Sequence, residues 1–273
     1  MNSHPISSIE YDVQKKRVTF NKIYRYLTSK LDREKAFIAA MILLAFKYLS
    51  SFKAKFLILV AIISLVICTV LVESEIFMIL AIVFILLFLF DYILIQIMQI
   101  LNPHKAALLR GLKLSNILGG CGFPVFIYKG VIIRDPAKVY IGDNVALYEN
   151  VVLIPGRGII SIGDNSHIDS LTVIHGSGDV IIGSKVAIAS GVIIYSHSNQ
   201  YAEGRKPIIE QPVVYKRVII EDDVWIGSGA IILPGAKVRK GAIIGAGALI
   251  TSDKELDEYT IYVGVPAKPF KKR

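Results

Sequence analysis

The sequence predicts a mainly β protein whose C-terminal part is a β-solenoid, preceded by an apolar, α-helical N-terminal region. Three observations predict this fold class. An aliphatic residue recurs at every sixth position from Ile220 to Ile250, the phrase I-G-[DS] recurs at Ile141, Ile162 and Ile182, and two long apolar runs come before residue 102. A period of six fits neither a helix nor a flat alternating strand. It fits a solenoid whose flat sides each take one hexapeptide.

The six-residue spacing continues back through the whole segment from Gly119. Sets of aliphatic positions are separated by eight or nine residues instead of six, and we expect these extra residues to be insertions at corners. About 18 residues then form one three-sided coil, and six coils stack. The residues expected to fill the core are Ile127, Ile133, Ile141, Leu147, Leu153, Ile162, Ile168, Ile174, Ile182, Ile188, Ile194, Ile220, Ile226, Ile232, Val238, Ile244 and Ile250.

The apolar runs predict a membrane anchor. Residues 56–72 and 76–95 are each long enough, at about 1.5 Å per residue, to cross most of a hydrocarbon layer roughly 30 Å thick. Lys and Arg side chains flank the pair, so the positive-inside rule predicts a multi-pass protein of the cytoplasmic (inner) membrane with the solenoid on the cytoplasmic side. The excess of Lys and Arg behind the net charge of +9 lies beside these runs, where basic residues are expected next to a membrane. No nucleic-acid partner is therefore expected.

These features divide the chain into four parts. The solenoid is the only one with a repeating pattern. The expected parts are a basic, partly helical region over 1–55, a two-helix transmembrane hairpin over 56–101, a linker over 102–118 and the solenoid domain over 119–273.

Three motifs near the C-terminus carry a family resemblance. They are V-W-I-G-S-G-A-I-I-L-P-G at 224–235, G-A-I-I-G-A-G-A-L-I-T at 241–251 and Y-T-I-Y-V-G-V-P-A-K at 259–268. With them, the segment 125–273 resembles the hexapeptide-repeat acyltransferases, and most of all their sugar O-acetyltransferase branch. The resemblance implies a left-handed parallel β-helix, a homotrimer, and acetyl-coenzyme A as co-substrate between neighbouring subunits. It says nothing about the apolar runs.

Acyl transfer from a thioester to a hydroxyl needs a base that takes the hydroxyl proton. The resemblance gives this role to His197, in I-I-Y-S-H-S-N-Q-Y, where a polar loop over 198–217 begins that we expect to project. Family members often carry an acid shortly after this histidine, whereas S-N-Q follows it here. The candidate assisting residues are Asn199 and Asp169, one coil below; a structural corner role is the alternative for Asp169.

The histidines also raise the alternative of a zinc site, as in the β-helical carbonic anhydrases. His175 and His197 are separated by more than a full coil, which does not match the spacing of those ligands. No metal is expected, and His175 is expected at a corner or in the substrate groove.

The resemblance also implies the residues that hold the cofactor. Trp225 lies in one of the matching motifs, and packing at a subunit interface is its alternative role. Lys268 matches the family lysine near the nucleotide phosphates, whereas Val265 replaces the usual Asn before the following proline. The backbone expected to line the pantetheine arm is that of Gly229, Ala230, Ala246 and Gly247.

The expected function is acetyl-coenzyme A-dependent O-acetylation of a sugar or saccharide in surface polysaccharide biosynthesis. The predicted membrane anchor favours a lipid-linked saccharide as acceptor. Two alternatives stay open: an N-acetyltransferase that acts on an amino sugar, and a catalytically silent trimeric scaffold tethered to the membrane.

Overall fold

The computed structural model describes residues 25–26, 97, 100, 102–202 and 204–273. The chain divides into two compact units, one of residues 19–116 and one that contains residues 117–273. The expected transmembrane hairpin lies outside the described residues except for Ile97 and Ile100, and the basic N-terminal region does so except for two residues. Among the residues that the structure does describe, no helix is long and apolar enough to span a bilayer.

Within the first unit, the segment expected to be a linker forms helix α6 (Pro103–Leu114). Its start is fixed by Asn102, whose side chain accepts a 3.0 Å hydrogen bond from the backbone N–H of Lys105. Proline at the first helical position adds to this start signal. At the other end the Ser115 backbone N–H donates to the Gly111 carbonyl at 3.0 Å. The sequence analysis missed this helix, although N-P at 102–103 is an N-terminal signature.

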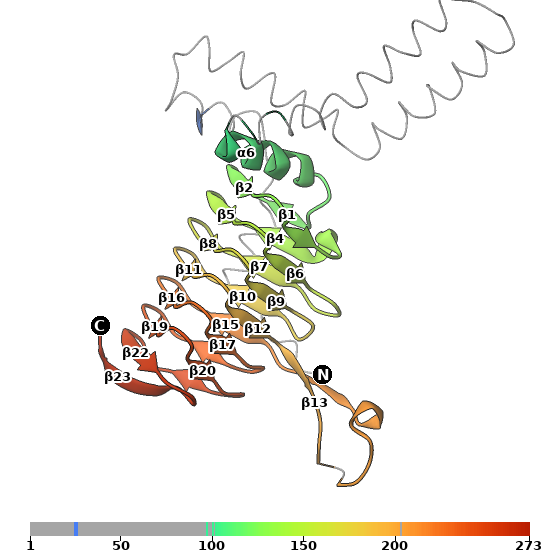
Figure 1. Ribbon diagram of the computed structural model, residues 1–273, viewed down its shortest axis with the longest axis vertical. Coiled ribbons are helices and arrows are strands. Elements are labelled where there is room, and N and C mark those ends of the chain that lie inside the picture. The colour runs from blue at the N-terminus through green and yellow to red at the C-terminus, as the bar shows by residue number, and fades with distance from the viewer. Residues whose placement is uncertain (1–24, 27–96, 98–99, 101, 203) are drawn as a thin grey trace, which may run out of the picture. The chain divides into compact units, whose positions relative to one another are not determined.

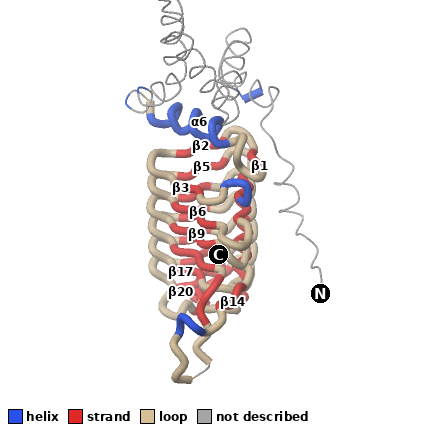
Figure 2. Tube along the Cα trace, turned by 90° about the vertical axis from the view of Figure 1, so that its right-hand side faces the viewer, coloured by secondary structure: helices blue, strands red, loops and turns tan. Residues whose placement is uncertain are grey.

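The second unit is a parallel β-helix with three sheets, and each complete coil contributes one short strand to each sheet (Figures 1 and 2). The first sheet contains β1 (Gly120–Cys121), β4 (Val139–Ile141), β7 (Ile160–Ile162), β10 (Val180–Ile182), β15 (Val218–Ile220), β18 (Lys237–Val238) and β21 (Glu255–Leu256). The second contains β2 (Val125–Ile127), β5 (Val145–Leu147), β8 (His167–Ile168), β11 (Ala187–Ile188), β16 (Trp225–Ile226), β19 (Ile243–Ile244), β22 (Thr260–Val263) and β23 (Lys268–Lys272). The third contains β3 (Ile132–Ile133), β6 (Val152–Ile154), β9 (Val173–His175), β12 (Ile193–Tyr195), β17 (Ile231–Ile232) and β20 (Leu249–Ile250).

The predicted core is confirmed at nearly every position. From Ile141 to Ile250, every residue expected inside is completely buried, because strands of successive coils pair in register and align these side chains in columns. Each such burial contributes roughly 1.5–3 kcal/mol. The exception is Ile133, which is half-buried in the first coil. That coil has a neighbouring strand of the third sheet on only one side, since β3 pairs only with β6.

The solenoid has about seven coils, not the six expected. The spacing of six continues from Ile250 to Leu256 and Tyr262, which are 0% and 3% exposed. We missed this last, incomplete coil because an aromatic residue replaces the aliphatic one. β23 then runs back antiparallel to β22 and ends the second sheet.

The repeated I-G-[DS] phrase forms the corner between the first and second sheets. There Asp164 Oδ1 accepts a 2.7 Å hydrogen bond from the Asp143 N–H, and Asp222 Oδ1 accepts one of 2.7 Å from the Ser184 N–H. The glycine of the phrase lets the next coil approach: a Cβ on Gly183 would lie 2.4 Å from Asp222 Oδ1. The phrase is therefore a ladder of side-chain acceptors that joins successive coils.

The corner between the third and first sheets carries the expected projecting loop, which is an arm with its own structure (Figure 1). Strand β13 (His197–Asn199) pairs antiparallel with β14 (Val213–Tyr215), and a 3-10 turn (Ile208–Glu210) lies between them. A second 3-10 turn (Pro136–Lys138) fills the same corner of the first coil. The arm does not disturb the stack, since β10 pairs with β15 in register on either side of it.

Candidate active site

The candidate base lies where the arm leaves the solenoid. Ser196, which is completely buried, fixes this corner: its Oγ donates to the His175 carbonyl at 3.0 Å and accepts from the Gly178 N–H at 2.8 Å. The next residue, His197, begins β13 and lies opposite Tyr215 of β14. The backbone thus holds His197 at the root of the arm, beside the end of the third sheet.

Four rings gather at this root. The His197 ring centroid lies 4.2 Å from that of His175, 5.4 Å from Tyr195 and 6.3 Å from Tyr215. His175 and Tyr195 stack at 5.5 Å because β9 and β12 pair them directly. Arg157 lies over the Tyr215 ring, with its guanidinium carbon 5.1 Å from the centroid and Nη1 3.4 Å from the hydroxyl. We call these five residues the ring cluster.

Burial favours the neutral form of both imidazoles. Burial lowers the pKa of His197. Burial also lowers the pKa of His175, with smaller contributions from the positive charges of His197 and Arg134. His197 Nδ1 and Ser161 Oγ are the two buried side-chain polar atoms that have no hydrogen-bond partner within the described part of the chain. A buried unpaired acceptor or donor is costly, and a catalytic role is one explanation for such a group.

The two candidate assisting residues take different places relative to His197 within one chain. Asp169 lies at the corner between the second and third sheets, where its N–H donates to the Ile188 carbonyl at 2.8 Å. His197 leaves from a different corner, and no contact joins the two within the described chain. Asn199 lies on β13, two residues after His197, and its side chain is exposed. The assisting role and the corner role of Asp169 both stay predictions.

Sequence reasoning missed three members of the ring cluster. Tyr195 is two residues before His197, and its outward direction follows from the alternation of β12. Tyr215 reaches the cluster through the antiparallel pairing of the arm, and Arg157 comes from an earlier coil. No local motif marks these last two residues.

The residues expected to line the cofactor lie along the corner between the second and third sheets. Gly229 and Gly247 take left-handed backbone with φ of 68° and 66°, and a Cβ on either would meet nothing within 4 Å. Gly191, one coil earlier, has the same conformation and the same open space, and the sequence analysis missed it. These three glycines form a smooth edge of the solenoid, which we call the glycine edge. It is continuous because the Gly247 N–H donates to Ser228 and the Gly229 N–H to Ser190.

The glycine edge stops at Leu171. This residue occupies the equivalent corner of the preceding coil with φ of 64°, and its side chain is 62% exposed. Ala230 is buried beside the edge and so is not free to touch a ligand with its side chain, whereas Ala246 is exposed. Trp225 is 54% exposed on β16, and Lys268 is exposed at the start of β23. The backbone of the three glycines is therefore accessible along the edge.

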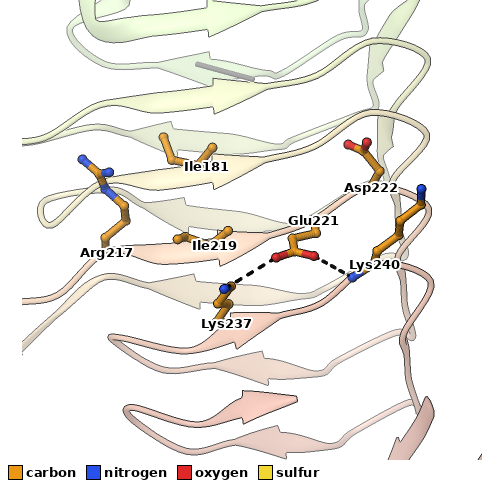
Figure 3. Close-up of a pocket in the computed structure, with 7 residues that line it drawn as sticks. All are labelled: Ile181, Arg217, Ile219, Glu221, Asp222, Lys237 and Lys240. Carbon is orange, nitrogen blue, oxygen red and sulfur yellow. Dashed lines mark hydrogen bonds and ion pairs between the residues drawn. The ribbon is translucent and has the colours of Figure 1, made fainter. Parts of the chain in front are cut away.

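A cavity of about 300 Å³ lies elsewhere, on the outer face of the first sheet (Figure 3). Its charged side chains neutralise one another: Lys237 Nζ lies 3.7 Å from Glu221 and 3.3 Å from Glu255. The Lys240 N–H also donates to Glu221 at 3.0 Å. The cavity contains none of the ring cluster and none of the glycine edge.

Comparisons with known proteins agree with this arrangement. The family model described as bacterial transferase hexapeptide (six repeats) matches residues 217–252. The chain is 37% identical to the dTDP-4-amino-4,6-dideoxy-D-glucose acyltransferase of Escherichia coli over 53% of this chain and 80% of that protein. It is 29% identical to the candidate lipopolysaccharide biosynthesis O-acetyl transferase WbbJ of Escherichia coli K12, over 59% and 93%.

A solved structure is also similar. It is a variant of AntD, an N-acyltransferase from Bacillus cereus, in complex with dTDP and coenzyme A. The TM-score is 0.50 with 30% identity, over 55% of this chain and 82% of that one. From the repeat, the three-sheet solenoid and these relatives together, the chain belongs to the hexapeptide-repeat transferase family and is an acyltransferase.

Proposed function

We propose that this protein transfers an acetyl group from acetyl-coenzyme A to a sugar hydroxyl, with His197 as general base. The observation that carries the proposal is the His197 ring at the root of the arm, whose neutral form is favoured by burial and whose Nδ1 is buried and unpartnered. A neutral imidazole can take the hydroxyl proton as the oxygen attacks the thioester carbonyl. The thiolate of coenzyme A then leaves and is protonated.

The remaining members of the ring cluster supply a surface for the acceptor. Tyr195 and Tyr215 offer flat apolar faces with polar edges, which suit the alternating C–H and O–H groups of a sugar ring. Arg157, at the rim, adds a fixed positive charge. We propose that the acceptor lies against these rings with its reacting hydroxyl toward His197.

The donor is proposed to lie along the glycine edge. Bound acetyl-coenzyme A supplies the thioester; the chain supplies the backbone of Gly191, Gly229 and Gly247, where a side chain would fill the open space. Lys268 and Trp225, exposed on the second sheet, are proposed to contact the nucleotide end.

We further propose that a complete site needs two copies of the chain, in a homotrimer. His197 and the glycine edge lie on different corners of the three-sided solenoid. Packing three such prisms about a parallel axis would bring the His197 corner of one copy toward the glycine edge of the next. The test is complementation: His197→Ala and Gly229→Tyr variants, each inactive, should regain part of the activity when they are assembled together, and sedimentation should report three copies.

The second candidate is N-acylation of an amino sugar, which the Escherichia coli and Bacillus cereus relatives favour because their names specify an aminosugar acyltransferase and an N-acyltransferase. One experiment separates the two functions. Release of free coenzyme A is measured with hydroxyl and amino sugars, free, nucleotide-linked and lipid-linked, for the wild type and for His197→Ala. Mild alkali removes an acetyl ester from the product but leaves an amide intact.

We expect turnover with a hydroxyl acceptor and a loss of about 10²-fold or more in kcat for His197→Ala. Turnover with an amino sugar alone would favour the second candidate, and an undiminished kcat in His197→Ala would exclude His197 as the base.

A lipid-linked acceptor at the cytoplasmic membrane is a further proposal, which rests on the apolar runs of the sequence. Recovery of the full chain in the soluble fraction of cells would contradict it.

A further inference from the structure

The base lacks the orienting group that general-base histidines commonly use. A carboxylate or carbonyl that accepts from one imidazole nitrogen usually fixes the tautomer and the ring. Within the described residues, no hydrogen bond reaches His197 Nδ1, and no acid contributes to the shift of its pKa. The carboxylate of Asp179, at the same corner one coil earlier, is already engaged by the Ile159 N–H at 3.1 Å and by Arg217 at 2.9 Å. Another group must therefore hold the His197 ring.

The ring that lies closest to His197 is His175. Their centroids are 4.2 Å apart with planes tilted by 47°. His175 is itself fixed on both sides: Ser177 Oγ lies 3.3 Å from its Nδ1, and Tyr195 stacks on its face. Its backbone carbonyl accepts from Ser196, the residue directly before His197, so the two histidines share one rigid corner.

We propose that His175 is a positioning residue: its neutral imidazole packs against His197, fixes the orientation of that ring and shields it from water, the task that a carboxylate performs elsewhere. This inference rests on the proposed acyl transfer and adds a second residue to it. The sequence alone did not predict the pairing, since 22 positions separate the two histidines and Tyr195 is the residue that β12 places directly beside His175.

The electrostatics of the corner agree with this role. Two imidazolium ions this close would repel each other strongly in a half-buried site, so at most one of the two rings is an imidazolium near neutral pH. Among the described residues, the titratable and charged groups with a ring contact or an electrostatic effect on this cluster are Tyr195 on β12, Tyr215 on β14, Arg134 after β3 and Arg157, which lies over Tyr215. None is a carboxylate. A protonated His175 is therefore disfavoured, and the ring is available as a neutral, well-packed support.

The kinetic test compares the full-length wild type with His175→Ala, which removes the ring, and His175→Phe, which keeps a ring without a titratable proton. We expect His175→Ala to lower kcat on the order of 10-fold to 10²-fold, because the base is no longer held. The KM for acetyl-coenzyme A should not change, since His175 is not on the glycine edge. His175→Phe should recover most of the loss.

The pH profile distinguishes positioning from mere structural support. Removal of the ring lets water reach His197, so its pKa should rise toward the ordinary value and the acidic limb of kcat/KM should move to higher pH. His175→Phe should leave that limb where the wild type has it. Equal losses for both variants with an unshifted limb would overturn the proposal, and so would His175→Ala with wild-type kcat.

Chemical modification of His197 tests the pairing with His175 independently of acyl transfer. Diethyl pyrocarbonate modifies neutral imidazoles, and peptide mapping reports the modification of His197 as a function of pH without any turnover. We expect faster modification of His197 and a higher apparent pKa in His175→Ala, and wild-type behaviour in His175→Phe. If His197 titrates identically in all three proteins, the pairing is wrong even if acyl transfer is confirmed. If the shift is seen without any acyl transfer, the pairing stands and the function fails.

Discussion

The backbone N–H of Asp143 donates a 2.7 Å hydrogen bond to the carboxylate of Asp164, one coil further along the solenoid. Replacement of Asp164 by Ala leaves the Asp143 N–H without this acceptor in a half-buried corner. We expect a loss of about 1–3 kcal/mol in the free energy of unfolding, measured by urea denaturation. Asp164→Asn keeps an acceptor oxygen and should lose clearly less. Equal losses for the two variants would mean that the hydrogen bond does not stabilise the corner.

The glycine edge predicts a donor-specific defect. Asparagine tolerates left-handed backbone, so Gly229→Asn should fold with little change in melting temperature while its side chain fills the open space. We expect a rise of about 10-fold or more in KM for acetyl-coenzyme A, the loss of roughly 1.4 kcal/mol of binding. The matched control is Gly204→Asn in the arm, which also has positive φ and open space. An unchanged KM in Gly229→Asn would place the donor elsewhere.

Leu171 carries backbone strain that a polar residue can relieve. Its φ of 64° costs a leucine roughly 1–2 kcal/mol, and its 62% exposed side chain recovers little by burial. Leu171→Asn should therefore increase the free energy of unfolding by about 1 kcal/mol, measured as a higher denaturation midpoint. A decrease would show that the leucine side chain is buried in the assembled protein, for example against another copy.

The lowered pKa values of His175 and His197 predict a dependence of stability on pH. The unfolded chain binds protons on these residues near pH 6.5, whereas the folded chain binds them only at lower pH. Stability should therefore fall as the pH drops from about 6.5 through the folded pKa values. The double variant His175→Phe, His197→Phe should show a shallower fall in melting temperature between pH 7 and pH 5. Identical slopes would indicate that other groups dominate the acid sensitivity.

Tyr215 provides a test of the acceptor side. Tyr215→Ala removes the ring that faces His197 from the arm, so the KM for the saccharide should rise several-fold while the KM for acetyl-coenzyme A stays constant. Tyr215→Phe keeps the face and loses the contact of its hydroxyl with Arg157, and it should lie between Tyr215→Ala and the wild type. Initial-rate measurements with each substrate varied separately check this. A change confined to the donor KM would refute the assignment.

The solenoid was predictable because its core depends on a local rule. Within each coil an aliphatic side chain every sixth residue fills each flat side, and every such residue expected inside from Ile141 to Ile250 is buried. The rule failed only at the two ends: Ile133 is half-buried, and Tyr262 replaces an aliphatic residue in the last coil. We expected a linker instead of helix α6 because the apolar runs directly before it dominate this part of the sequence. The N-cap residue Asn102 and the proline after it are the local signal for the start of the helix.

The site was less predictable because it depends on contacts between segments that are distant in the sequence. His197 was found by its motif, but its neighbour His175 comes from the previous coil and Tyr215 from the returning strand of the arm. Asp169 lies one coil below His197, as expected, but at a different corner of the solenoid. The six-residue spacing predicts which coil a residue belongs to more readily than it predicts the corner at which a polar residue lies.

The in-register pairing of β10 with β15 across the whole arm has an evolutionary consequence. The arm enters and leaves at one corner, so its length and sequence can change without any rearrangement of the core. Acceptor preference, which we assign to the arm and its root, is therefore free to diverge between relatives while the donor edge stays the same. Replacement of the arm by that of another family member should therefore change the acceptor preference while the solenoid still folds.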